Sequence, residues 1–225
     1  MTSSLQALVF DFDGLILDTE TPQFHTVAAA FVEHGVVLDR ADWQDIIGTA
    51  GHPHWSEMLA DALGDRAADV DFDAVRQQRL EEYHALLEDL EPLAGVVDLV
   101  DAAFDAGLGL AVASSSPLYW VDGHLTRLGL RDRFASVHTR DHVERTKPAP
   151  DLFQRAVEAL GTDPARAVAL EDSPHGVTAA KAAGLVAVAC PNEITSGQAF
   201  DHADLVVESL ERVSLADLAA LITET

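Results

Sequence analysis

From Gly107 onward, the chain alternates short apolar runs with segments of helical pattern, and this alternation constrains the fold more than any other feature. The apolar runs are continuous and consist mostly of alanine, leucine and β-branched residues, which is typical of strands buried on both faces of a parallel sheet. The helical segments between them must then cover both faces. The pattern predicts a doubly wound parallel α/β sheet, Rossmann-like in type, with strands at Leu108–Ala113, Ala135–His138, Ala167–Leu170, Leu185–Ala189 and Leu205–Val207.

The predicted helices of this part begin and end at recognisable residues. One begins after Pro150 and ends before Gly161. Ser173 and Pro174 suit the N-cap and the first turn of the next helix. Ser214, with an aspartate three residues later, resembles a capping box for the last helix. These signals support the alternation of strand and helix.

Residues 18–90 have a different pattern, with several helical periods and no convincing strand. Helices are expected at Pro22–Glu33, Asp42–Ile47, His54–Ala62 and Phe72–Leu90, with an inter-helix loop at Gly64–Asp69. The proline and glycine of Glu91–Gly95 break the helical pattern and predict a return hinge. We therefore expect an α/β core domain of residues 1–17 and 91–225, and a helical cap domain of residues 18–90 inserted after the first strand.

Two carboxylates follow the first apolar run, Ala7–Phe10, directly. Side chains alternate between the faces of a strand, so Asp11 and Asp13 project to the same side where the strand ends. Gly14 lets the backbone turn sharply there. Two like charges held this close raise the proton affinity of one of them unless a cation intervenes. Such a pair suits a metal-bound nucleophile, or a nucleophile beside a general acid.

Other polar residues follow the later strands at the same edge. Ser114–Ser116 follow Ala113, and Glu171 and Asp172 follow Leu170. Lys147 lies on a loop just before a helix and is one of the two lysines in the chain; the other, Lys181, lies mid-helix and is interpreted as a solvated side chain. Because ligands of open α/β sheets bind at the carboxyl ends of the strands, these groups are expected to form one site.

The charge of this predicted site calls for a cation. Asp11, Asp13, Glu171 and Asp172 would surround a dianionic phosphate with up to four negative charges. Each unscreened pair near 4 Å costs roughly 4 kcal/mol at an effective dielectric of 20. Lys147 alone cannot offset this repulsion. Mg²⁺ takes a few carboxylates together with waters and a phosphate oxygen, so the sequence predicts Mg²⁺ as the cofactor.

Composition excludes several classes of partner. The formal charge of −24 over 225 residues argues against nucleic acid, whose binding rests on Lys and Arg contacts with phosphate, and against an anionic membrane surface. No apolar run is long enough to span a bilayer, and no basic segment followed by an apolar one opens the chain. The single cysteine, Cys190, excludes an internal disulfide. We expect a cytoplasmic monomer that acts on a small phosphorylated metabolite.

The motifs, taken in order, resemble the four signatures of the haloacid dehalogenase (HAD) superfamily. They are Asp11-Phe-Asp13-Gly with the following Asp-Thr-Glu, Ser114, Lys147-Pro, and Glu171-Asp172. The resemblance covers essentially the whole chain and is specific as a set. It points to the β-phosphoglucomutase-like subgroup with a helical cap.

The resemblance implies a HAD-type phosphoric monoester hydrolase and a role for each motif. Asp11 is the nucleophile that forms an aspartyl-phosphate, and Asp13 is the general acid and then the general base. Ser114, the neighbouring Ser115 and Lys147 bind phosphate. The metal ligands are Asp11, Asp13 through its main-chain carbonyl, Glu171 and Asp172.

The cap loop is less specific. Relatives use a glycine-containing loop at this place to contact the substrate, often with an arginine shortly after the glycine. Gly48 fits this pattern, but no arginine follows, and the nearest candidates are His52 and His54. These three residues are the candidate substrate contacts, against the alternative of a surface loop with packed tryptophans.

Two other functions stay open at this point. A β-phosphoglucomutase-type sugar-phosphate mutase keeps a histidine where this chain has Gln23, and His25 comes two residues late. A phosphorylatable signalling or binding module also uses aspartate, Ser/Thr and lysine on a parallel sheet, but without an insertion of this size. Dehalogenases typically lack a second aspartate, and phosphonoacetaldehyde hydrolases need a cap lysine, which residues 18–90 do not contain. The leading hypothesis is a Mg²⁺-dependent phosphatase of a small metabolite.

Overall fold

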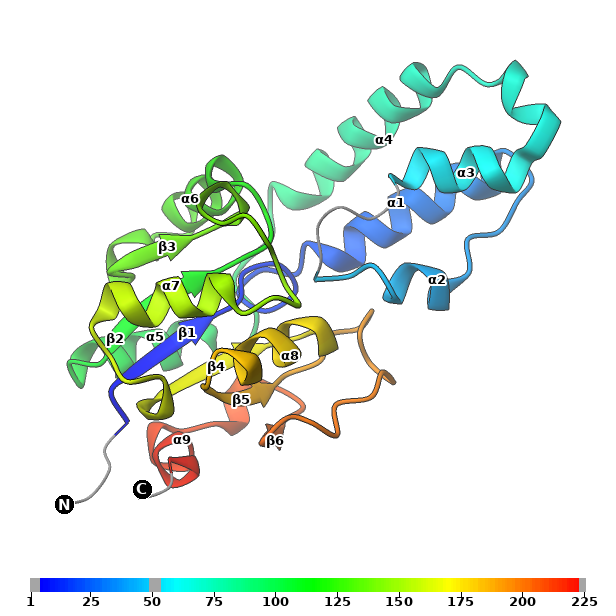
Figure 1. Cartoon of the computed structure of the whole chain (residues 1–225). Helices are drawn as coiled ribbons and strands as arrows, with labels where there is room; N and C mark the ends of the chain where they lie inside the picture. The colour runs from blue at the N-terminus through cyan, green and yellow to red at the C-terminus, as the bar shows by residue number, and fades with distance from the viewer. Residues whose placement is uncertain (1–4, 49–53, 223–225) are drawn as a thin grey trace.

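The computed structural model describes residues 5–48 and 54–222. Their strands form one parallel sheet of six strands in the order β3-β2-β1-β4-β5-β6 (Figure 1). The sequence-based prediction of a parallel sheet is confirmed; each of the five strands predicted after Gly107 keeps one end, and its other end moves by one residue. The strands are β1 (Ala7–Phe10), β2 (Gly109–Ala113), β3 (Ser136–His138), β4 (Ala167–Glu171), β5 (Val186–Ala189) and β6 (Leu205–Val206).

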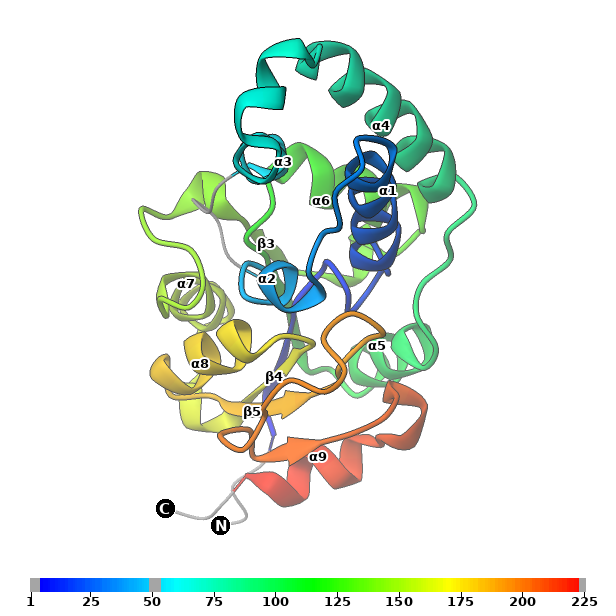
Figure 2. The same cartoon turned by 90° about the vertical axis from the view of Figure 1, so that its right-hand side faces the viewer.

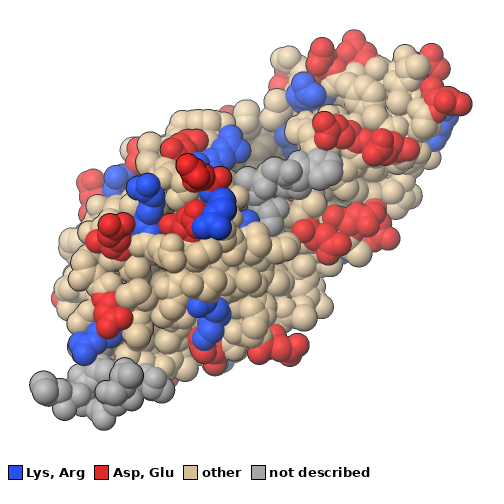
Figure 3. Space-filling view, in the orientation of Figure 1, with Lys and Arg blue, Asp and Glu red and all other residues tan. Residues whose placement is uncertain are grey.

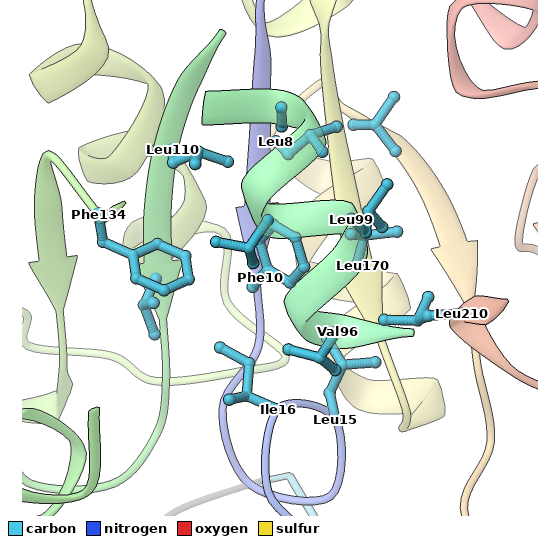
Figure 4. Packing of buried hydrophobic residues seen from close by; sticks show 14 of the residues in the cluster. Leu8, Phe10, Leu15, Ile16, Val96, Leu99, Leu110, Phe134, Leu170 and Leu210 are labelled. Carbon is cyan, nitrogen blue, oxygen red and sulfur yellow. The ribbon is translucent and has the colours of Figure 1, made fainter. Parts of the chain in front are cut away.

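Helices cover both faces of the sheet, as the alternation predicts. On one face, α7 (Asp151–Leu160) and α8 (Pro174–Ala182) pack against the small side chains of the strands. On the other face, α5 (Val96–Asp105), α6 (Leu118–Arg127) and α9 (Leu215–Leu221) pack against larger ones. Figure 4 shows this second layer, in which Phe10, Leu110 and Leu170 of three adjacent strands meet Val96 and Leu99 of α5.

The predicted helix signals around this core are present. Pro150 is the N-cap of α7, and Gly161 ends it with a left-handed φ of 63°. The Ser173 hydroxyl caps α8 by accepting a hydrogen bond from the Gly176 N–H at 3.1 Å. Ser214 forms the expected capping box of α9. The side chains of Ser173 and Ser214 each satisfy an amide that the helix itself leaves unbonded.

The register of the central strand sets the position of the polar residues. Phe10 pairs with Val112 of β2 and with Leu170 of β4. The residues that come next in these three strands therefore lie level with one another at the carboxyl edge of the sheet. They are Asp11, Ala113 and Glu171. The fold thus brings segments from distant parts of the sequence to one edge.

Between β1 and α5, four α-helices of the described residues form a separate lobe, here called the cap (Figures 1 and 2). Its buried apolar side chains form their own cluster, which includes Val27, Phe31 and Leu59. The expectation of a helical insertion after the first strand is confirmed; its domain boundaries at residues 18 and 90 stay a prediction. The cap helices are α1 (Glu20–Glu33), α2 (Arg40–Gln44), α3 (Trp55–Leu63) and α4 (Phe72–Leu87).

The loop predicted at Gly64–Asp69 is wrong, because this segment forms the 3₁₀-helix η1. Gly64 has a φ of +57°, and the Val70 N–H donates to the Ala67 carbonyl at 3.2 Å, which closes a three-residue turn. A short turn of this kind leaves no apolar period in the sequence, so periodicity alone does not detect it. Four further 3₁₀-helices lie in the core: η2 (Arg131–Arg133), η3 (Arg140–His142), η4 (Pro164–Arg166) and η5 (Leu210–Arg212).

Charged side chains are spread over both lobes. On the face shown in Figure 3, acidic side chains lie on the cap and on the core, and the basic ones of the core lie beside acidic ones. Exposed ion pairs of this type include Arg145 with Asp151 (2.7 Å) and Arg133 with Asp101 (2.8 Å). Within residues 5–48 and 54–222, none of the helices has the length and apolar character needed to cross a membrane.

Candidate active site

Three buried carboxylates meet at the carboxyl edge of the sheet. Asp11 follows β1, Glu171 ends β4, and Asp172 comes next. One carboxylate oxygen from each lies within 4.8 Å of the others. The structure therefore brings together three of the four acidic residues that the sequence predicts for a metal site.

Lys147 supplies the positive charge in this cluster. Its ammonium group donates to Asp11 Oδ1 and to Glu171 Oε1, the latter at 2.5 Å. The side chain is fully enclosed and also lies 5.2 Å from the centre of the Phe153 ring. Lys181, by contrast, pairs with Asp204 at the surface, as expected for a solvated lysine. The two lysines thus differ as the sequence predicts.

Three buried carboxylates share one lysine, and both burial and mutual repulsion raise the pKa of Asp11 and Asp172. Burial raises the pKa of Asp11 to about 8; Lys147 opposes this rise, and the charges of Glu171 and Asp13 add to it. Burial also raises the pKa of Asp172 well above its usual value, and Asp11 and Glu171 raise it further. Burial disfavours the Lys147 ammonium, but Asp11 and Glu171 outweigh this and raise its pKa. The cluster therefore favours additional positive charge.

Backbone and side-chain donors fix the orientation of two of these carboxylates. Glu171 Oε2 accepts from the amides of Asp172 (3.1 Å) and Ser173 (3.3 Å), and from the Ser173 hydroxyl (3.1 Å). Asn192 Nδ2 donates to Asp172 Oδ2 at 2.7 Å. Asn192 was not predicted from the sequence, although it comes shortly after β5 and the strand-end rule points to it.

Glycine is required at position 14 for two reasons: the backbone turns there, and two side chains approach it closely. Its φ is +80°, and a Cβ at this position would lie 2.4 Å from both Asn192 Nδ2 and Asp172 Oδ2. No other residue leaves room for these two side chains. The glycine that ends the first motif therefore shapes the acidic cluster, which is a stronger role than the sharp turn expected from the sequence.

Asp13 lies apart from the lysine and accepts four hydrogen bonds. Its Oδ1 accepts from the Thr19 hydroxyl and from Trp120 Nε1, both at 2.8 Å. Its Oδ2 accepts from the hydroxyls of Ser116 (2.6 Å) and Ser114 (3.3 Å). The carboxyl group of Asp13 is thus held by donors on both oxygens.

The donor set fits a hard divalent cation. Asp11, Glu171 and Asp172 offer carboxylate oxygens only, and three buried carboxylates face the single ammonium of Lys147. Such a set of oxygens at close range suits Mg²⁺. The side chain of Asp13 accepts hydrogen bonds from its own four donors, and the expected role of its main-chain carbonyl as a metal ligand stays a prediction.

A cavity of about 370 Å³ opens between the core and the cap above these residues. Cavities of this size take small molecules. Asp11 and Asp13 form part of its floor, and all three serines of Ser114–Ser116 line it. Trp120 and Arg140 of the core also line the cavity. The lining residues of the cap are Glu20, Gln23, Trp43, Ile46, Ile47, Gly48, His54 and Tyr83.

The predicted cap contacts fall partly on this cavity. Gly48 and His54 both line it. Gly48 has a φ of +76°, and its carbonyl accepts a hydrogen bond from the Ser115 hydroxyl at 3.0 Å, so Ser115 joins the core to the cap. His52 lies outside the described residues. The roles assigned to these residues stay predictions.

Glu20 is the cavity residue whose importance the sequence did not reveal. Burial, with the nearby charges of Asp13, Asp11 and Asp18, raises the pKa of its carboxyl group to about 8. It belongs to the Asp-Thr-Glu segment of the first motif, but nothing in its spacing distinguishes a cavity-facing glutamate from a surface one.

The fold and the site together define a class: a protein with a Rossmann-like α/β core, buried carboxylates at the edge of its sheet and a helical cap above them. Comparison with known families agrees. The family model "Haloacid dehalogenase-like hydrolase" matches residues 8–190. The chain belongs to this family of hydrolases, within the group that contains CbbY and β-phosphoglucomutase-like proteins.

Similar proteins include phosphatases. The chain is 40% identical to the Bacillus subtilis (strain 168) protein named "Putative phosphatase YhcW", over 94% of this chain and 95% of that protein. It is 35% identical to the fructose-1-phosphate phosphatase YqaB of Escherichia coli (strain K12), over 80% and 94%. A crystal structure of a CbbY variant from Rhodobacter sphaeroides with xylulose-(1,5)bisphosphate superposes with a TM-score of 0.73 at 29% identity, over 95% and 99% of the two chains.

Proposed function

We propose that the protein is a Mg²⁺-dependent phosphatase that hydrolyses a small phosphorylated metabolite through an aspartyl-phosphate on Asp11. The observation that carries the proposal is the position of Asp11. Its carboxylate lines the cavity and contacts the Lys147 ammonium, and it lies within reach of two further carboxylates. A buried carboxylate beside a lysine and a cation can attack a phosphorus atom without repelling the phosphate.

In the first step, Asp11 attacks phosphorus and the bond from phosphorus to the leaving oxygen breaks. Asp13 lines the same cavity and gives its proton to that oxygen. In the second step, Asp13 takes a proton from a water molecule, which attacks the phosphorus and releases phosphate and the Asp11 carboxylate. The two carboxylates have different partners, as their different roles require.

The other residues of the site bind the phosphate group and balance its charge. Lys147 neutralises Asp11 and the phosphate, and Ser114 faces the phosphate from the end of β2. Asp11, Glu171, Asp172 and the main-chain carbonyl of Asp13 would hold Mg²⁺, which supplies positive charge to the phosphate oxygens when it is bound. Positioning and charge stabilisation account for most of the catalysis of phosphoryl transfer.

The substrate we propose is a monophosphate of a sugar or sugar alcohol. The cavity offers Glu20 and Gln23 as hydrogen-bonding partners for hydroxyl groups. Among its described lining residues, Arg140 is the one Lys or Arg, so a second phosphate would meet little positive charge. Similar proteins named fructose-1-phosphate phosphatase and hexitol phosphatase B support this substrate class.

The test is phosphate release from a panel of phosphorylated metabolites. We expect turnover of sugar or sugar-alcohol monophosphates with Mg²⁺ and none with a chelator, and restoration when Mg²⁺ is added back. Borohydride, which reduces acyl phosphates, should convert position 11 to homoserine during turnover, as peptide mass spectrometry would show. An isomerised sugar phosphate in place of free phosphate would indicate a mutase, and an aspartyl-phosphate that lasts for minutes would indicate a signalling module.

A further inference from the structure

Trp120 contacts Asp13 directly, and no motif predicts this contact. Trp120 lies in the first turn of α6, and its Nε1 donates to Asp13 Oδ1 at 2.8 Å. The same oxygen accepts from the Thr19 hydroxyl at 2.8 Å. The hydroxyls of Ser116 and Ser114 donate to the other oxygen, Oδ2. The indole is therefore one of four donors that surround the proposed general acid.

The indole differs from the other three donors in its chemistry. A hydroxyl group donates or accepts, so Thr19, Ser114 and Ser116 can turn to accept a hydrogen bond when Asp13 is protonated. An indole N–H can only donate. The oxygen that faces Trp120 must therefore stay an acceptor in both protonation states of Asp13. Because a carbonyl oxygen is a better acceptor than the hydroxyl oxygen of a carboxylic acid, the proton of Asp13 is favoured on Oδ2, the oxygen on the side of Ser114 and the proposed phosphate site.

The indole ring is itself fixed by aromatic neighbours from both lobes. It stacks on Tyr83 of the cap helix α4, with ring centres 6.1 Å apart and 11° between the planes. It meets the His124 ring edge-on at 4.4 Å. The Tyr83 hydroxyl donates to the Thr19 carbonyl at 3.3 Å, and Thr19 in turn contacts Asp13. Trp120 thus has little freedom to move away from Asp13.

We infer that Trp120 is a positioning residue that directs the proton of Asp13 to Oδ2, from which it passes to the leaving oxygen of the substrate. The inference rests on the proposed phosphatase function. Its step is the first proton transfer: the O–H bond at Asp13 Oδ2 breaks as the leaving oxygen separates from phosphorus and takes the proton. Trp120 keeps its own proton throughout.

The inference predicts a dependence on the leaving group. A sugar leaves as an unstable alkoxide unless it is protonated, whereas p-nitrophenolate leaves without help. Trp120→Phe retains an aromatic ring beside Tyr83 but removes the N–H. We expect kcat/KM for the sugar or sugar-alcohol monophosphate found in the panel to fall by roughly 10-fold to 100-fold, since a misplaced catalytic group commonly costs this much. For p-nitrophenyl phosphate we expect a change of less than about 3-fold.

Two controls separate positioning from structure. Trp55→Phe makes the same change inside the cap cluster, where the ring lies near Arg79, and should leave the ratio of the two kcat/KM values as in the wild type. In an Asp13→Asn background, Trp120→Phe should cause no further selective loss, because the acid through which it acts is absent. If Trp120→Phe does not fold, benzothienylalanine at position 120 keeps the ring shape and lacks only the N–H.

The outcomes are distinct. A selective loss for the sugar phosphate that disappears in the Asp13→Asn background supports the inference. An equal loss for both substrates, or no loss for either, overturns it while the phosphatase function stands. A wild-type protein that releases phosphate from neither substrate overturns the inference and the proposed function together.

Discussion

The core and the cap satisfy their buried polar groups to different degrees. At the sheet edge, Asp11, Lys147 and Glu171 bond to one another or to backbone amides. Within the described residues, the buried side-chain atoms without a hydrogen-bond partner are Thr21 Oγ1, Trp43 Nε1 and Arg79 Nε of the cap, and Gln198 Oε1 of a core loop that contacts the cap. The chemistry is thus preorganised in the core, whereas the cap leaves several buried polar atoms without a partner.

This difference assigns separate tasks to the two lobes. A preorganised site stabilises charge at no cost of rearrangement, which suits a reaction step that is the same for every substrate. The cap side chains that line the cavity, such as Glu20 and Gln23, suit the recognition of a variable leaving group. We therefore expect substitution of the proposed nucleophile Asp11 in the core to abolish turnover, and substitution of cavity-lining cap residues to change substrate preference.

The largest expected effect is that of Asp11→Asn. It removes the nucleophile and should lower kcat by more than roughly 10⁴-fold, as removal of a nucleophile does in other enzymes. Glu20→Gln is the matched control, since it makes the same replacement of a carboxyl group by a carboxamide in the same cavity. It should raise KM for a sugar phosphate by roughly 10-fold and leave kcat for p-nitrophenyl phosphate within about 3-fold of the wild type. Similar losses of kcat in both variants would break the division between core and cap.

Lys147→Met tests how strongly the core depends on its buried charge. Without the ammonium, the carboxylates of Asp11 and Glu171 are uncompensated, and the free energy of unfolding should fall by about 3–5 kcal/mol. Lys181→Met makes the same change in the exposed pair with Asp204 and should cost less than about 1 kcal/mol. Urea unfolding of both variants at pH 7 with a chelator measures the difference. Equal losses would show that burial of the first pair contributes nothing.

Most of the core could be predicted because its signals are local. Continuous apolar runs identify buried strands, and one rule, that ligands bind at the carboxyl ends of parallel strands, assembles Asp11, Ser114 and Glu171 without any knowledge of distances. The structure places these residues at one edge, as β1, β2 and β4 pair in register.

The cap and the second layer of contacts could not be predicted as well. Trp120 reaches Asp13 from a helix 107 positions away in the chain, and nothing in its local sequence separates it from a core tryptophan. Asn192 contacts Asp172 because Gly14 leaves room, which is a fact of packing and has no period in the sequence. The orientation of Glu20 toward the cavity likewise depends on how α1 sits above the core.

The raised pKa of Glu20, a residue that lines the cavity, predicts that the stability of the protein depends on pH. Because the pKa of Glu20 is raised to about 8, the folded protein keeps a proton that the unfolded chain loses at lower pH. The contribution of Glu20 to stability therefore falls as pH rises from roughly 4.5 to 8. Glu20→Gln lacks this titration, so its free energy of unfolding relative to the wild type should increase by roughly 1–3 kcal/mol between pH 5 and pH 8.

Urea unfolding at the two pH values, with a chelator present, measures this change. Glu81→Gln, on the exposed side of α4, is the control and should parallel the wild type. A Glu20→Gln variant that also parallels the wild type would mean that the carboxyl group is well solvated, and the cap side of the cavity would then be more open than its lining suggests.

The smallest expected effect tests the contact between the two lobes. Tyr83→Phe keeps the ring that stacks on Trp120 and removes the hydroxyl that donates to the Thr19 carbonyl at 3.3 Å. Burial raises the pKa of Tyr83, with the charges of Asp13 and Glu20 adding to the rise, so the hydroxyl is a neutral donor over the whole working range of pH. Loss of one long neutral hydrogen bond should lower the free energy of unfolding by about 0.5–1.5 kcal/mol. Because the ring and the Trp120 N–H remain, kcat should stay within about 3-fold of the wild type. A loss of kcat approaching that of Asp11→Asn would instead show that the cap takes part in the chemical step, and the separation of tasks between the lobes would have to be abandoned.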